Sequence, residues 1–313
     1  MPSRFRSPRQ RQDGSRQLER EHSLLVIERA VWEMPNSILF ALFAALAILL
    51  AAQRALAESA PFRVEPSMVG VEDAFPVAVG RTELELSYSY STAAKAFDDD
   101  GDTFSRGDNA THVGAFTATH GFTNYLDASV GIFGAYSQDD DEPEHSVTGL
   151  GDFFVNAKWR FLGEGDDGLH LAYQPGLSIP VGKHDDDKNL SPGLGFWTFD
   201  QRLIATLIER RWVGGVSASF RLPFGDRNGA RGFASANLGL GYQLTPWLKP
   251  ELELNYVREF ATGRKDAEAV AATVGAILNL SDALRADLGF RHDFYGLNAD
   301  RRLSVIASFL WTF

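Results

Sequence analysis

The sequence contains no cysteine among its 313 residues. This absence excludes a disulfide framework, thiolate metal sites and a thiol nucleophile. The mean hydropathy is slightly negative, at -0.16, which excludes a membrane protein built from many apolar helices. Glycines and prolines cluster between short runs in which apolar and polar residues alternate. This pattern predicts a many-stranded β protein, either soluble or a transmembrane barrel, because barrel strands are only half apolar.

Long apolar runs are absent except for Ile38–Ala52. Its 15 residues are fewer than the roughly 20 that a helix needs to cross a bilayer. The following Ala55-Leu56-Ala57 is a small-x-small pattern that predicts signal-peptide cleavage before Glu58. We expect residues 1–57 to be an N-terminal extension and signal peptide, residues 58–79 a periplasmic lead-in, and residues 80–313 the folded domain. Two alternatives stay open, an uncleaved membrane anchor and a true start at Met34 instead of Met1.

Basic residues are scarce once the predicted signal peptide is removed. Residues 1–57 carry eight arginines and five acids, which leaves 22 basic and 36 acidic residues, a net charge of -14. Nucleic-acid binding needs a basic surface to meet the phosphates. The sequence therefore predicts that no nucleic acid is a partner.

Alternation with a period of two residues runs through residues 80–313. Leu84, Leu86 and Tyr88 alternate with Glu83 and Glu85, and side chains at alternate positions of a strand point to opposite sides. Aromatic residues gather near the strand ends, which favours a membrane barrel over a soluble sandwich, the alternative. An even number of strands with longer polar connections at one end is typical of bacterial outer-membrane barrels. We predict an all-β, antiparallel, up-and-down transmembrane β-barrel of twelve strands at 80–91, 110–120, 126–137, 149–162, 168–179, 194–206, 212–222, 232–243, 248–260, 268–279, 283–294 and 301–313.

The last predicted strand ends on an aromatic carboxyl-terminal residue. From Leu303 onward, one face of this strand is apolar at every position. The other face is polar, with Ile306 and Leu310 as apolar exceptions. Such a tail resembles the signal by which barrel-assembly machinery recognises its clients. We therefore expect the bacterial outer membrane as the location, with membrane lipid, lipopolysaccharide and the assembly machinery as partners. The predicted assembly signal is Phe309, Trp311 and Phe313, preceded at alternate positions by Leu303, Val305 and Ala307.

Charged residues of both signs occupy the face of the strands opposite the apolar one. Charges cannot face lipid at low cost, so these side chains must face a wet or paired interior. They either line a solute pathway or form an ion-paired network that fills the lumen, and twelve strands fall between filled barrels and open porins. We favour a narrow, selective path for a small solute and keep a structural or adhesion barrel with a plugged lumen as the alternative. The predicted lumen-facing residues are Glu83, Glu85, Asp152, Lys158, Arg160, His170, Asp200, Arg202, Arg221, Glu251, Glu253, Arg285, Asp287 and Arg291.

Two other chemistries were weighed and not favoured. The acidic clusters 98–102, 139–142 and 185–187 lie in predicted extracellular loops, but the first lacks the closing glutamate of a calcium loop. A lipid-cleaving barrel needs a serine and a histidine on one outer face. His112, His120 and His170 have no serine two residues away, although a pair from different strands stays open. We expect no catalytic residue, no metal and no cofactor.

Two glycine-rich motifs carry a family resemblance. Gly149-Leu150-Gly151-Asp152 opens the fourth predicted strand, and Pro175-Gly176-Leu177-Ser178-Ile179-Pro180-Val181-Gly182 ends the fifth. With Phe313 and the length of the chain, these motifs resemble the outer-membrane transporters named for the meta-cleavage pathway of phenol degradation, over residues 80–313. The resemblance implies an inward-pointing Asp152, a strand that ends before Pro180, and passive uptake of an aromatic or hydrophobic solute.

Overall fold

The computed structural model describes residues 64–141, 146–182, 192–224, 230–261 and 265–313, all within one compact unit that spans residues 60–313. Strands make up most of this part of the chain. In the described residues, no helix is long and apolar enough to cross a membrane. The strands are β1 (Thr82–Phe97), β2 (Thr103–Thr123), β3 (Leu126–Asp139), β4 (Ser146–Leu162), β5 (Gly168–Ile179), β6 (Trp197–Glu209), β7 (Trp212–Phe224), β8 (Ala230–Tyr242), β9 (Leu248–Ala261), β10 (Ala267–Asn279), β11 (Leu284–Leu297), β12 (Ala299–Asp300) and β13 (Leu303–Thr312).

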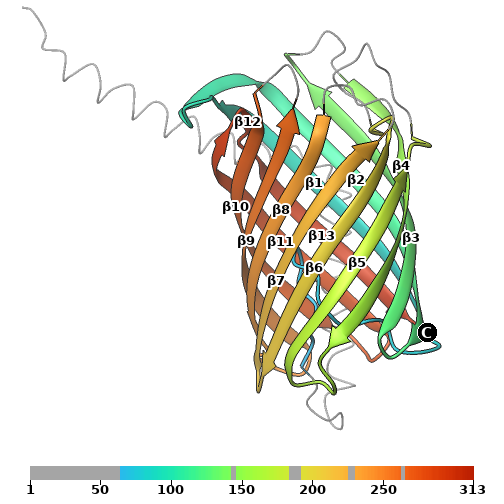
Figure 1. The fold of residues 1–313 in the computed structure, drawn as a ribbon. Coiled ribbons are helices and arrows are strands. Elements are labelled where there is room, and N and C mark those ends of the chain that lie inside the picture. The colour runs from blue at the N-terminus through green and yellow to red at the C-terminus, as the bar shows by residue number, and fades with distance from the viewer. Residues whose placement is uncertain (1–63, 142–145, 183–191, 225–229, 262–264) are drawn as a thin grey trace, which may run out of the picture. The chain divides into compact units, whose positions relative to one another are not determined.

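The strands form one antiparallel sheet that closes on itself (Figure 1). β1 pairs with β2 on one side and with both β12 and β13 on the other. The short β12 and the longer β13 therefore share one place in the sheet, so that the thirteen described strands make a barrel of twelve positions. The predicted fold class and strand number are confirmed.

The closing seam between β1 and β13 has the register that the alternation predicts. Leu84 lies opposite Trp311, and Leu86 lies opposite Phe309. These side chains are 53% exposed for Trp311, 61% for Leu86 and 41% for Phe309, and similar apolar side chains are exposed all around the barrel. A continuous apolar surface of this kind is a lipid-facing surface. The outer wall of the barrel is therefore the membrane contact.

The two ends of the barrel differ. One end, which we call the terminus end, carries the carboxyl terminus and the tight turns β2–β3, β8–β9 and β10–β11 (Figure 1). In these turns a hydroxyl accepts a backbone N–H, from Tyr125 to Thr123 at 3.1 Å and from Leu248 to Thr245 at 3.1 Å. Hydroxyl side chains commonly bond to the backbone of a turn in this way. The opposite end, which we call the loop end, carries the longer connections.

The β1–β2 hairpin is longer than predicted. The predicted strands 80–91 and 110–120 leave residues 92–109 between them, whereas β1 continues to Phe97 and β2 begins at Thr103. Ala96 and Phe97 pair with β12 as well as with β2, after a bulge between Ala93 and Lys95. The added part of β1, Ala93-Ala94-Lys95-Ala96-Phe97, has apolar residues on both faces and contains the bulge, so a test for alternation misses it.

Candidate functional site

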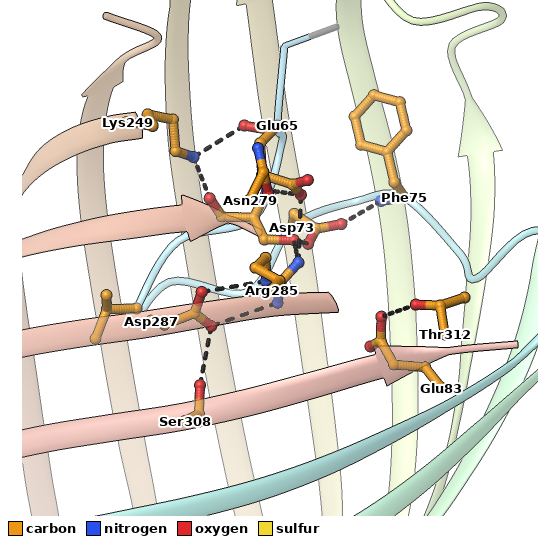
Figure 2. Close-up of polar contacts among 12 residues, drawn as sticks. Glu65, Asp73, Phe75, Glu83, Lys249, Asn279, Arg285, Asp287, Ser308 and Thr312 are labelled. Atoms are coloured by element: carbon orange, nitrogen blue, oxygen red, sulfur yellow. Dashed lines mark hydrogen bonds and ion pairs between the residues drawn. The ribbon is translucent and has the colours of Figure 1, made fainter. Parts of the chain in front are cut away.

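Residues 64–77, part of the predicted lead-in, lie inside the barrel at its terminus end, and we call them the lumen segment. Figure 2 shows this segment in pale blue, surrounded by strands. Met68 and Val71 are 7% and 2% exposed and form an apolar cluster with Ile208 and Val213 of the barrel. Burial of these side chains holds the segment in place because it removes apolar surface from water.

Glycines of the inner wall leave room for the lumen segment. A Cβ atom on Gly215 or Gly239 would lie 3.0 or 2.3 Å from the sulfur of Met68. A Cβ on Gly289 would lie 2.8 Å from a methyl group of Val69. Glycine inside a strand often marks such a close approach. These positions therefore fit the segment into the barrel.

Backbone N–H groups of the lumen segment donate to side chains of the wall. The segment has no strand partner, so its buried amides need side-chain acceptors. Three different strands, β3, β6 and β9, supply them. The pairs are Val69 with Glu251 at 2.7 Å, Gly70 with Glu253 at 2.8 Å, Ala74 with Thr206 at 2.9 Å and Val77 with Asp127 at 2.8 Å.

Two cationic side chains of the wall bind the beginning of the lumen segment (Figure 2). Lys249 donates to the carbonyl oxygen of Glu65 at 2.9 Å and also to that of Ser67. The Arg285 guanidinium lies 3.2 Å from the Glu65 carboxylate and donates to the Ser67 hydroxyl at 2.7 Å. It also pairs with Asp287 of its own strand at 3.1 Å. These buried charges are thus paired and hydrogen-bonded, which a low-dielectric interior requires.

The other side of the lumen segment faces β4 and β6. Lys158 lies 3.9 Å from both Glu72 and Asp73 and donates to the carbonyl oxygen of Phe75 at 3.4 Å. Arg202 lies 2.8 Å from Glu72. The acids of the segment therefore complement the bases of the wall, although the Glu72 side chain remains 43% exposed.

The ring of Phe75 lies between two side chains of the wall. Its centroid is 4.3 Å from that of the His170 ring, and the Arg160 guanidinium lies 5.1 Å from the ring centroid. An arginine over an aromatic face is attracted by the ring quadrupole. Phe75 thereby anchors the end of the lumen segment next to β4 and β5.

A cavity of about 1060 Å³ occupies the loop-end half of the lumen, and we call it the vestibule. Hydroxyl and amide side chains line the part of the vestibule nearer the lumen segment, and aromatic and charged side chains line the part nearer the loop end. A chain of side-chain hydrogen bonds crosses four strands at the level between the vestibule and the lumen segment. It joins Ser217 to Asn237 at 3.1 Å, Asn237 to Asn255 at 3.2 Å and Asn255 to Thr273 at 2.8 Å.

Ion pairs join the loop-end parts of β2, β3 and β12 at the mouth of the vestibule. Arg106 pairs with both Asp139 and Asp300, and Asn109 donates to the same two carboxylates at 3.3 and 3.2 Å. The acidic stretch at 98–102 is also engaged, because Asp98 accepts the N–H groups of residues 100 and 102 at 3.0 and 2.9 Å. These contacts fix the extended β1–β2 hairpin at the rim.

The two family motifs meet in space. Asp152 is 1% exposed and accepts N–H groups from Gly182 at 3.3 Å and from Leu194 at 2.8 Å. A Cβ on Gly182 would lie 2.5 Å from the backbone of Gly151, so this approach needs glycine. β5 ends at Ile179, before Pro180. Asp152 therefore holds both described arms of the β5–β6 connection against the barrel.

Burial places the predicted lumen-facing residues on the inner wall. Glu251 and Glu253 are 5% and 1% exposed, whereas Leu252 between them is 56% exposed. Asp200 pairs with Arg221 at 2.5 Å, and Arg291 pairs with Asp293 at 3.2 Å. The buried members are Asp152, Lys158, Arg160, His170, Glu251, Glu253 and Asp287, and the half-buried ones are Glu83, Glu85, Asp200, Arg202, Arg221, Arg285 and Arg291. Phe309, Trp311 and Phe313 of the predicted assembly signal lie exposed on the outer wall.

Several residues of the lumen were not predicted from the sequence. The lumen segment itself was expected to precede the barrel, and Asp127, Thr206 and Lys249 were not singled out. Lys249 shares its strand face with Glu251 and Glu253, so the alternation contains a signal for it. Nothing in the pattern of residues 64–77 indicates that they occupy the lumen.

The hydrogen bonds of the described histidines bear on the hydrolase alternative. His112 bonds to Tyr88 at 2.7 Å, and His120 bonds to Thr82 at 2.9 Å, both on the outer wall. His292 lies 3.3 Å from Arg301. In the part of the chain that the structure describes, no histidine is hydrogen-bonded to a serine. The acidic cluster 185–187 lies outside the described residues.

Three solved structures resemble this barrel. An outer membrane channel from Pseudomonas putida F1 aligns with a TM-score of 0.68 and 18% identity, over 79% of this chain and 100% of that one. The KdgM porin in complex with oligogalacturonate gives 0.45, 10% identity, and 73% and 99% coverage. The β domain of the Bordetella autotransporter BrkA gives 0.47, 15% identity, and 74% and 99% coverage. At these identities the first likeness is one of fold, and the other two carry no further weight.

The sequence comparisons identify the family. No curated protein matches the sequence significantly. One family model, described as "Putative MetA-pathway of phenol degradation", matches residues 85–302, which is more than half of the chain. With a closed barrel, a lipid-facing outer wall and this match, the chain belongs to that family of outer-membrane β-barrel proteins.

Proposed function

We propose that this protein is an outer-membrane channel through which a small solute diffuses passively. In this proposal the solute enters the vestibule from the loop end and passes the lumen segment to reach the periplasm. The lumen segment narrows the passage and restricts it to small molecules.

The observation that carries this proposal is the polar vestibule of about 1060 Å³ above the lumen segment. A barrel whose interior served only structure would be expected to fill its lumen with side chains, as small barrels do. Here the loop-end half is hollow, and its lining offers hydroxyl, amide and charged groups. Such a lining suits a wet pathway.

We further propose that the solute is an aromatic compound, which the family description supports. Phe97, Phe104 and Phe233 contribute aromatic rings to the vestibule lining. An aromatic solute can contact these rings while its polar group bonds to the hydroxyls and amides nearby. Fold alone does not determine which solute passes, so the proposal of an aromatic solute depends on the side chains that line the vestibule.

The test is permeation through the purified protein. In planar bilayers we expect single-channel steps, and in proteoliposomes we expect uptake of a small phenolic solute above that of protein-free vesicles. Steps without phenolic uptake would reject the solute class and leave a channel for other molecules. Neither steps nor uptake would reject the channel.

A second candidate is a structural or adhesion barrel with a plugged lumen. The buried contacts of Met68, Val71 and Ala74 favour it, because they close much of the terminus end. Permeation again separates the two, since a plugged barrel passes neither ions nor solutes when the lumen segment is intact.

A further inference from the structure

The lumen segment covers the inner wall unevenly. On β3, β6 and β9, the inward-facing Asp127, Thr206 and Glu253 are 1%, 0% and 1% exposed because the segment lies against them. On β1, the inward-facing side chains from Glu83 through Ser91 all keep intermediate exposure. Solvent therefore reaches the inner wall along β1 at the level where the lumen segment covers the inner faces of β3, β6 and β9.

The accessible stripe along β1 reaches from the terminus end to the vestibule. Glu83 and Glu85 lie near the terminus end, Ser87 follows, and Ser89 and Ser91 line the vestibule. On the neighbouring β2, alternate side chains from Thr111 to Thr119 also keep intermediate exposure. Two adjacent strands thus offer one continuous accessible surface between the two ends of the lumen, which is polar along β1 and is interrupted on β2 by the apolar Val113 and Ala115.

Acidic side chains outnumber basic ones around this stripe. Glu83 accepts a hydrogen bond from Thr312 at 3.2 Å, but neither Glu83 nor Glu85 lies within ion-pair distance of a base in the described chain. The bases nearby already have acidic partners: Lys158 and Arg202 both lie near Glu72. Arg285, whose positive charge also acts on Glu83 and Glu85, is itself paired with Glu65 and Asp287. The two glutamates of β1 therefore add negative charge without an ion pair of their own.

The vestibule has the same sign of charge. Six acidic and three arginine side chains are among the residues that line it. Charge of one sign in a confined polar space concentrates ions of the opposite sign and lowers the concentration of like-charged ones. A cation that enters from the loop end therefore meets negative potential in the vestibule and again at Glu83 and Glu85.

We propose that the passage of this barrel follows β1 and β2 and prefers cations over anions, with Glu83 and Glu85 setting the preference. The inference rests on the proposed channel function and adds to it the charge of the permeant. Neutral and cationic solutes pass, and carboxylate-bearing solutes are disfavoured. For aromatic solutes, this means that a phenol or an aromatic amine is accepted better than an aromatic acid.

The test is the reversal potential of the purified protein in planar bilayers under a KCl gradient at about pH 8, where glutamates carry their charge. Low salt is used on both sides, because salt screens the effect. We expect K⁺ to permeate roughly fivefold better than Cl⁻ in the unmodified protein. In the double variant Glu83→Gln and Glu85→Gln, we expect the ratio to fall to about one.

Matched variants separate the possible causes. Glu164→Gln removes one carboxylate from the exposed β4–β5 turn and is expected to leave the ratio unchanged. Glu85→Gln alone disturbs no hydrogen bond and serves if the double variant fails to assemble; we expect it to lower the ratio partway. Glu85→Lys is expected to lower it further.

The outcomes are distinguishable. Absence of any conductance in the unmodified protein would reject the proposed channel itself. Conductance with equal or anion-favouring permeability would overturn this inference and leave the channel standing. An unmodified ratio that survives in both Glu85→Gln and Glu85→Lys would show that the passage does not follow β1.

Discussion

The guanidinium of Arg285 lies 3.2 Å from the carboxylate of Glu65, a residue 220 positions earlier in the chain. This pair joins the barrel wall to the lumen segment. Arg285 also donates to Ser67 at 2.7 Å, so one side chain fixes two residues at the beginning of the segment. Arg285 and Lys249 hold this end of the segment through charged contacts. Met68 and Val71 hold the segment further along the chain through apolar contacts.

Replacement of Arg285 is expected to loosen the lumen segment. In Arg285→Ala, Glu65 and Asp287 both lose this ion pair, which leaves their carboxylates in a partly buried site without the Arg285 cation. We expect higher single-channel conductance, because the segment then leaves its seat more often. Arg81→Ala, at an exposed position before β1, is the control and should conduct like the unmodified protein. Equal conductance in both variants would show that the ion pair does not hold the segment.

A substitution at Val71 tests the apolar contacts that hold the lumen segment. It is 2% exposed against Ile208 and Val213, and an aspartate there would be a buried carboxylate without a cation. We expect Val71→Asp to displace the segment and raise conductance while the barrel still assembles. Heat-modifiable migration in gels reports barrel assembly, and Val79→Asp at a 55% exposed position is the control. A Val71→Asp barrel with unchanged conductance would contradict the placement of the segment in the passage.

Asp152 is expected to stabilise the β5–β6 connection and not the barrel as a whole. In Asp152→Ala, the N–H groups of Gly182 and Leu194 lose their acceptor, at a cost of about 1–3 kcal/mol for each buried group left unpaired. We expect faster proteolytic cleavage within the connection and an unchanged barrel core. Asp166→Ala, in the exposed β4–β5 turn, is the matched control. Cleavage at the same rate in both variants would show that Asp152 does not stabilise the β5–β6 connection.

Phe313 tests the predicted assembly signal. Its side chain is 50% exposed on the outer wall, so its removal costs little packing in the finished barrel. On our proposal that assembly machinery recognises the tail of the unfolded chain, we expect Phe313→Ala to lower the amount of folded barrel in the outer membrane. Phe290→Ala removes a phenylalanine of similar exposure, 48%, from the same wall and is the control. A similar loss in both variants would point to stability of the barrel instead of recognition.

Strand positions could be predicted because a membrane barrel imposes a strict period of two. β5 matches its predicted bounds, and most other strands differ by a few residues. The prediction missed the extension of β1 to Phe97, since Ala93-Ala94-Lys95-Ala96-Phe97 does not alternate between apolar and polar residues. The inward side of Glu251 and Glu253 could be predicted for the same reason that the outward side of Leu252 could: lipid excludes charge.

The amino-acid pattern alone was enough to predict the barrel, the membrane that it occupies and the face on which most strand residues lie. Those features follow from local alternation, and each strand carries its own copy of the pattern. The closed barrel was needed to show that residues 64–77 fill the terminus end of the lumen, and that Asp152 contacts the two described arms of the β5–β6 connection. Contacts such as Glu65 with Arg285 or Gly70 with Glu253 join residues that are far apart in the chain, and they depend on the closed wall. A segment that takes its hydrogen bonds from many strands needs no period of its own, so its sequence carries no sign of its place.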